Sequence, residues 1–131
     1  QVRIDFTLTL PGLFEVEKIQ TVGQRYNTQI LSKVIFSFTP DIVMSPLALP
    51  KDILHPWVDE LLPTAKGAMH DVLTQLKMRP TFQEQWPDEY QAGLKKGKAR
   101  IEMLEQIRKD TYTMRDILSM REDALQWWEA I

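Results

Sequence analysis

The chain has 131 residues and no cysteine, and its 16 basic and 18 acidic residues leave a net charge of −2. The absence of cysteine excludes disulfides, thiol catalysis and cysteine zinc sites. The balanced charge gives no general attraction to nucleic acid or to an anionic membrane. Hydrophobic residues make up 44% of the chain, enough for a globular domain to bury a core of its own. No apolar run approaches the roughly 18 residues of a membrane span, so no membrane partner is expected.

Residues 1–40 are rich in strand signals. Apolar and polar residues alternate strictly over residues 2–10, which indicates a half-buried strand. Pro11 and Gly12 then turn the chain, and residues 13–22 and 32–39 are predicted as a second and a third strand. The pattern therefore predicts a small antiparallel sheet of about three strands.

Residues 41–56 are predicted to form an extended connector. Pro46, Pro50 and Pro56 interrupt it, and proline fixes φ and removes a backbone donor. Its apolar residues, Leu47 and Leu49 among them, are too numerous for a segment that lies in water. We expect another surface to cover this connector, and a neighbouring subunit would explain its composition.

Residues 57–131 are predicted to form a bundle of about three helices. Pro63 should kink the first helix or start a new one, and Pro87 suits the first position of the next. A last helix is predicted to follow Thr111 or Thr113, and Thr113 and Asp116 have the spacing of a capping box. The predicted fold is thus α+β, a single domain over residues 1–131. Because the chain opens at Gln1 inside a strand pattern, we expect an N-terminal part to be missing.

Catalytic and metal-binding patterns are not found in the sequence. His55 and His70 lie fifteen residues apart without companion ligands, whereas a zinc site needs three or four convergent ones. Carboxylate pairs such as Glu102 and Glu105 have the spacing of a solvated helix face. Phosphate-binding glycine loops and nucleophile motifs do not occur. We therefore expect no enzymatic activity, no catalytic or metal-ligating residue and no cofactor.

Small residues suggest close contact between two helices. A glycine inside a helix costs about 1 kcal/mol relative to alanine, and a close helix–helix approach would offset that cost. Two glycines four residues apart lie on one helix face. Two small patches are predicted to face each other, one on each helix: Ala65, Gly67 and Ala68 on the first, Gly93 and Gly97 on the second.

Basic residues gather at Lys95, Lys96, Lys98 and Arg100. Such a run is usually a solvated helix face, and the alternative is contact with DNA or an acidic partner. No aromatic residues interleave with it, which disfavours stacking on single-stranded bases.

Two adjacent tryptophans, Trp127 and Trp128, lie near the end of the chain. One helix face cannot bury both, so one is expected to pack on the domain. The other is a candidate for a subunit interface, together with Leu47 and Leu49 of the connector.

The order of these segments resembles the head–tail connector (adaptor) proteins of short-tailed bacteriophages. Strands ending in FSFTPD precede LALPKDIL, then a helix with TAKGAMHDVL, a break at MRP and a helix EYQAGLKKGKARIEML. The resemblance covers residues 33–109. Its matching positions are Leu49, Pro50, Ala65, Gly67, Ala68, Pro80, Tyr90, Leu94 and Gly97. Pro63 interrupts a helix that the family usually keeps continuous, and residues 111–131 have no counterpart in it.

The resemblance implies a structural virion protein in the neck of the particle, assembled in the host cytoplasm. Such adaptors form a ring, usually a dodecamer, between the portal protein and the tail proteins. Packaged DNA passes through the lumen, which the basic residues 95–100 could face. Two alternatives stay open: another phage assembly protein, such as a tail assembly chaperone, and a nucleic-acid-binding module that uses the basic residues.

Overall fold

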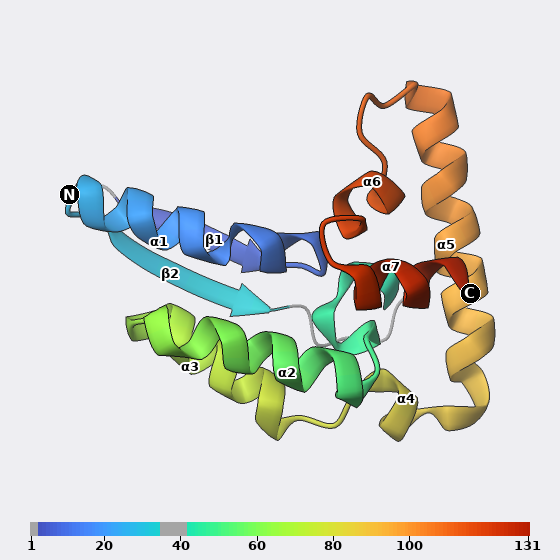
Figure 1. Ribbon diagram of the computed structural model, residues 1–131, viewed down its shortest axis with the longest axis horizontal. Coiled ribbons are helices and arrows are strands. Elements are labelled where there is room, and N and C mark those ends of the chain that lie inside the picture. The colour runs from blue at the N-terminus through green and yellow to red at the C-terminus, as the bar shows by residue number, and fades with distance from the viewer. Residues whose placement is uncertain (1–2, 35–41) are drawn as a thin grey trace.

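The computed structural model describes residues 3–34 and 42–131 (Figure 1). Its strands and helices are, in chain order, β1 (Arg3–Leu8), α1 (Val16–Arg25), β2 (Gln29–Val34), α2 (Lys51–Leu61), α3 (Gly67–Met78), α4 (Phe82–Gln85), α5 (Pro87–Arg108), α6 (Met114–Leu118) and α7 (Glu122–Glu129). Short 3-10 turns occupy Pro11–Glu15, Ile42–Met44, Pro46–Ala48 and Leu62–Thr64.

The predicted α+β fold, an antiparallel sheet followed by a three-helix bundle, is wrong. The described residues are mainly helical, and their two short strands pair only with each other, in parallel. Arg3 lies opposite Gln29 and Leu8 opposite Val34. The parallel direction follows from the connection, because α1 carries the chain back before β2 begins, whereas antiparallel neighbours can be joined by a tight hairpin.

The error arose at residues 13–22, which are helical and not a strand. Their buried side chains recur every three or four residues, at Leu13, Val16 and Gln20, which is the period of a helix. Gly23 continues this face. A Cβ atom there would lie 2.6 Å from Cδ1 of Ile30, so only glycine lets α1 approach β2 this closely. The third predicted strand begins earlier than expected, as β2, and its residues 35–39 lie outside the described residues.

The connector is correctly predicted to be apolar and covered, but it is not extended throughout. Two 3-10 turns occupy its middle, and α2 begins at Lys51, so Pro56 lies inside a helix. Leu47 and Leu49 are fully buried against this chain's own core. The connector's composition therefore needs no neighbouring subunit to explain it.

Helix ends in the second half follow the local signals. α2 ends just before Pro63, α5 begins at Pro87, and Thr113 caps α6 with both hydrogen bonds of a capping box. Two elements were not predicted. Thr81 and Glu84 form a second capping box that starts α4, and the final helical segment is divided into α6 and α7.

The elements form two arms that meet at a shared core. One arm holds the strand pair with α1, α2 and α3, and the other is the long helix α5, with α6 beside its upper half (Figure 1). β2 contacts both α1 and α3, and α5 packs on the 3-10 turn Ile42–Met44. Buried apolar side chains from β1 to α7 belong to a single cluster, which includes residues of both arms.

Candidate interaction surface

The two predicted small-residue patches do not meet. Gly67 begins α3, is exposed and has a φ of +58°, so it serves a turn and not a helix contact. Gly97 is buried and Gly93 half-buried on α5, in the other arm, where the helix packs on the connector (Figure 1). Ala65 is buried before α3 begins, and Ala68 is half-buried at its start.

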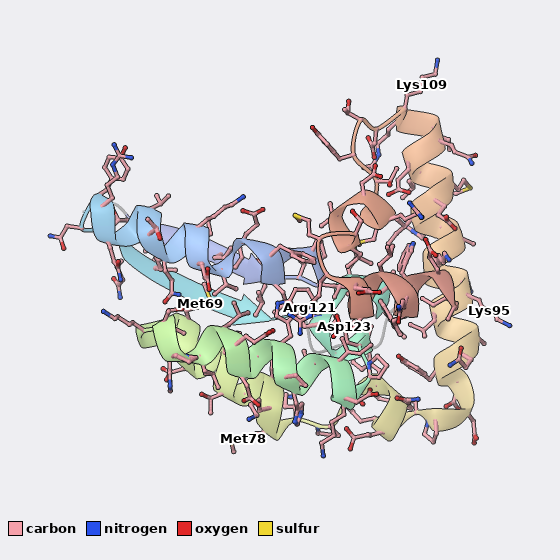
Figure 2. All side chains as sticks on the ribbon, viewed as in Figure 1. Met69, Met78, Lys95, Lys109, Arg121 and Asp123 are labelled. Carbon is pink, nitrogen blue, oxygen red and sulfur yellow. The ribbon has the colours of Figure 1, made fainter. Side chains whose placement is uncertain are left out.

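The four basic residues do not form one patch. Lys98 lies at the edge of the buried face, where its ammonium group donates to the backbone oxygen of Trp128 at 2.8 Å. The same nitrogen lies 5.3 Å from the centre of a Trp128 ring. Lys95 points away from the rest of the molecule (Figure 2). Lys96 and Arg100 are exposed four positions apart, on a third side of the helix.

The tryptophan pair is divided as its adjacency predicts. Trp128 is buried in the core, and Trp127 is half-buried against it, with the ring centroids 6.2 Å apart. Of the four residues expected at a subunit interface, Leu47, Leu49 and Trp128 are therefore inaccessible. Trp127 keeps a partly exposed surface.

The histidines stand apart from other metal ligands in the described part of the chain. No group of three or more histidine, cysteine or carboxylate residues there could hold a metal ion. His55 lies on α2, where burial, followed by the charges of Lys51 and Lys77, lowers its pKa below 6.5. His70 is exposed on α3 with Asp71 as its neighbour. None of the described helices is long and apolar enough to cross a bilayer.

Large apolar side chains are exposed along the second half of α5. Met103 and Ile107 are 52% and 69% exposed, and a spacing of four places them on one face. The buried face of α5 consists of Tyr90, Leu94 and Gly97. Ile107 is not part of that face and projects into solvent. Exposed Tyr112 follows in the loop after α5, so this end of the molecule is a candidate interaction surface.

A polar hollow of about 500 Å³ lies in the other arm, between the end of α1 and the start of α3. Its lining includes Gln20, Asn27, Lys66 and Gly67, and the described residues that line it include no aspartate or glutamate. The sequence pattern had singled out Gly67 only for helix packing. Neither the apolar end of α5 nor this hollow was predicted as a site.

Comparison of the chain with protein-family models, with curated proteins and with solved structures finds no match.

Proposed function

We propose that this protein is a non-catalytic structural subunit that assembles with copies of itself. The assembly that its sequence resemblance favours is the head–tail adaptor ring of a short-tailed bacteriophage, between the portal and the tail proteins. The observation that carries the proposal is the exposed apolar face of α5, formed by Met103 and Ile107.

The shape of α5 suits such a role. A helix of 22 residues is about 33 Å long. Its buried residues, Tyr90, Leu94 and Gly97, all lie in its first half. One side of the second half faces α6, where Glu105 accepts a hydrogen bond from the N–H of Met114, while Met103 and Ile107 lie in water. Each Å² of apolar surface left exposed costs roughly 25 cal/mol. A neighbouring subunit that covered Met103 and Ile107 would recover that energy.

A closed ring needs a heterologous contact, in which one surface of a subunit meets a different surface of the next. The end of α5 supplies one such surface. Replacing Met103 and Ile107 by glutamate would place two charges in this contact. Assembly would have to remove water from both charges, which is unfavourable unless each one is paired.

The test is a mass measurement of the full chain over a range of concentrations, with images of the particles formed. We expect closed rings, alone or with the portal protein of the same virus. The double variant Met103→Glu, Ile107→Glu should stay monomeric with an unchanged circular dichroism spectrum. Met78→Glu is the matched control, because Met78 is 79% exposed on α3 in the other arm, and it should assemble normally.

A wild-type chain that stays monomeric even with the portal would refute the proposal. Transient association without closed rings would instead favour a tail assembly chaperone. The nucleic-acid alternative has no observation in its favour, since the four basic residues lie on different sides of α5 and Lys98 is engaged by Trp128.

A further inference from the structure

We infer that the polar hollow between α1 and α3 binds a small oxyanion, a phosphate or carboxylate group. This site is independent of the proposed assembly surface, since it lies in the other arm of the molecule. Three features of the described residues carry the inference: an uncapped helix start, a buried amide without a partner, and a lining whose single charge is positive.

The start of α3 offers free backbone donors. The first N–H groups of a helix have no partner within it, and the helix dipole adds a partial positive charge there. Lys66 precedes α3 in an extended conformation, and no side chain caps the helix. By contrast, α4 and α6 each begin with a complete capping box. Gly67 leaves the approach open, since a Cβ atom there would have no neighbour within 4 Å.

Gln20 supplies the second, independent observation. Its side chain is brought to this helix start by α1, and its Oε1 accepts a hydrogen bond from the backbone N–H of Lys66 at 2.8 Å. That bond fixes the orientation of the amide, so its Nε2 is a donor held beside the same helix end. Gln20 is only 7% exposed, and its Nε2 has no hydrogen-bond partner. Buried donors almost always have partners, so this one indicates an absent acceptor.

The charge of the hollow favours an anion. Among the described residues that line it, Lys66 is the only charged one, and it forms no ion pair with the described part of the chain. The other polar groups are carboxamides and a hydroxyl, on Gln24, Asn27 and Thr28 among others. Glu17 lines a neighbouring hollow that shares Gln20, so the positive region is confined to the start of α3.

The hydrogen-bonding groups of an oxyanion and those of this hollow are complementary. An oxyanion has several acceptor oxygens, and the site offers the N–H groups at the start of α3, the Gln20 amide and the Lys66 ammonium group. Anions are commonly bound at helix N-termini for this reason. The group could be a free ion or the phosphoryl group of a larger molecule, and the two are separated by experiment.

The test is a titration of the ¹⁵N-labelled full chain with sodium phosphate, followed by amide chemical shifts, with sodium chloride keeping the ionic strength constant. We expect saturable shifts at the backbone amides of Gly67, Ala68 and Met69 and at the side-chain NH₂ of Gln20. Sodium acetate tests a carboxylate in the same way, and glycerol phosphate tests an esterified phosphoryl group. Binding of inorganic phosphate alone would assign a free ion, and binding of the ester as well would assign a phosphorylated molecule.

Three variants test the assignment. Lys66→Gln should weaken binding about two- to fivefold, as expected for one exposed charge. Lys95→Gln makes the same change on α5 and should leave binding unchanged. Gln20→Met removes the buried donor and should weaken binding about tenfold. If Gln20→Met fails to fold, two measurements still test whether the anion binds at this site. They are the chemical-shift change of the Gln20 NH₂ group in the wild-type protein and the comparison of Lys66→Gln with Lys95→Gln.

Two outcomes would overturn the inference. One is the absence of saturable shifts at the start of α3 with any of the three anions. The other is an equal loss of binding in Lys66→Gln and Lys95→Gln, which would mean a general attraction to positive charge.

Discussion

Arg121 joins the turn between α6 and α7 to α2 through several contacts of its guanidinium group. The guanidinium carbon lies 4.8 Å from the centre of a Trp57 ring, and one terminal nitrogen donates to Glu60. Its Nε lies 2.9 Å from Oδ1 of Asp123, an ion pair without the alignment of a hydrogen bond. Figure 2 shows Arg121 and Asp123 at the junction of the two arms. Arg121 is 21% exposed and Trp57 only 4%, whereas Glu60 is 61% exposed, so solvent screens the ion pair with Glu60 more than the contact with Trp57.

We predict that Arg121→Met lowers the free energy of unfolding by about 1–2 kcal/mol, measured by urea denaturation. Methionine keeps much of the apolar contact with Trp57 but loses the charge. Arg115→Met is the control: Arg115 pairs with Glu129 where both side chains are largely exposed, so its loss should cost less than about 0.5 kcal/mol. Equal effects of the two substitutions would mean that the charge of Arg121 contributes no more than that of an exposed ion pair.

The helices of the second half begin where a side chain can satisfy their first N–H groups. In α4, the hydroxyl oxygen of Thr81 accepts from the N–H of Glu84 at 3.3 Å, and Glu84 Oε1 accepts from the N–H of Thr81 at 3.2 Å. Thr113 and Asp116 repeat this arrangement in α6. These reciprocal bonds let helices of only four and five residues form, although such lengths are unstable in isolation.

We predict that Thr81→Ala destabilises the protein by about 1 kcal/mol, the usual cost of losing an N-cap hydroxyl. Thr81→Ser keeps the hydroxyl and should recover most of that loss, which thermal unfolding of the two variants would check. If serine were no better than alanine, the stability at this position would come from packing of the threonine methyl group.

The capping boxes of α4 and α6 make the stability of the protein depend on pH. The N–H of Thr81 is the main cause that holds the pKa of Glu84 below 4.5, and the N–H of Thr113 does the same for Asp116 below 3.8. Because the pKa values of these carboxyl groups are lowered in the folded state, their contribution to stability is complete above the ordinary pKa values. It is lost as the pH falls through the lowered pKa values of the folded state. Thr81→Ala keeps the backbone N–H and removes only the smaller contribution of the hydroxyl group to the lowered pKa of Glu84, so the acid side of its stability curve should be only slightly flatter.

At the scale of the whole molecule, α5 is attached to the other arm through its first half. The hydroxyl group of Tyr90 donates to the backbone oxygen of Ala48 in the connector, and both residues are buried. Leu94 and Gly97 continue this contact face. The second half of α5 is covered only on the side that faces α6, which leaves Met103 and Ile107 exposed for the proposed assembly.

We predict that Tyr90→Phe lowers the free energy of unfolding by about 1–2 kcal/mol, because the Ala48 oxygen stays buried without its donor. Burial raises the pKa of Tyr90 to about 12, so the neutral hydroxyl is favoured in the folded state. Stability should therefore fall as the pH rises from 10 toward 12, and this fall should be smaller in Tyr90→Phe. Tyr112→Phe, at an exposed tyrosine, should change neither quantity.

Local chemistry made part of this structure predictable. Pro63 and Pro87 act on their own backbone, and Thr113 caps the helix that follows it, so each marks a helix end whatever surrounds it. The alternation over residues 2–10 likewise identified β1. The apolar composition of the connector also indicated that something covers it, as the burial of Leu47 and Leu49 confirms.

What the sequence by itself determined about this protein is thus several helix ends in its second half and the burial of the connector. Only the tertiary structure decided what buries the connector. α1 packs on β2, where Gly23 allows a close approach to Ile30. Leu47 and Leu49 are buried in the core of their own chain, and α5 packs on the connector. The hydrogen bond between Gln20 and Lys66 likewise joins residues that are 46 positions apart in the chain. Such contacts depend on surfaces from distant segments, which no local pattern contains, and both candidate sites arise from them.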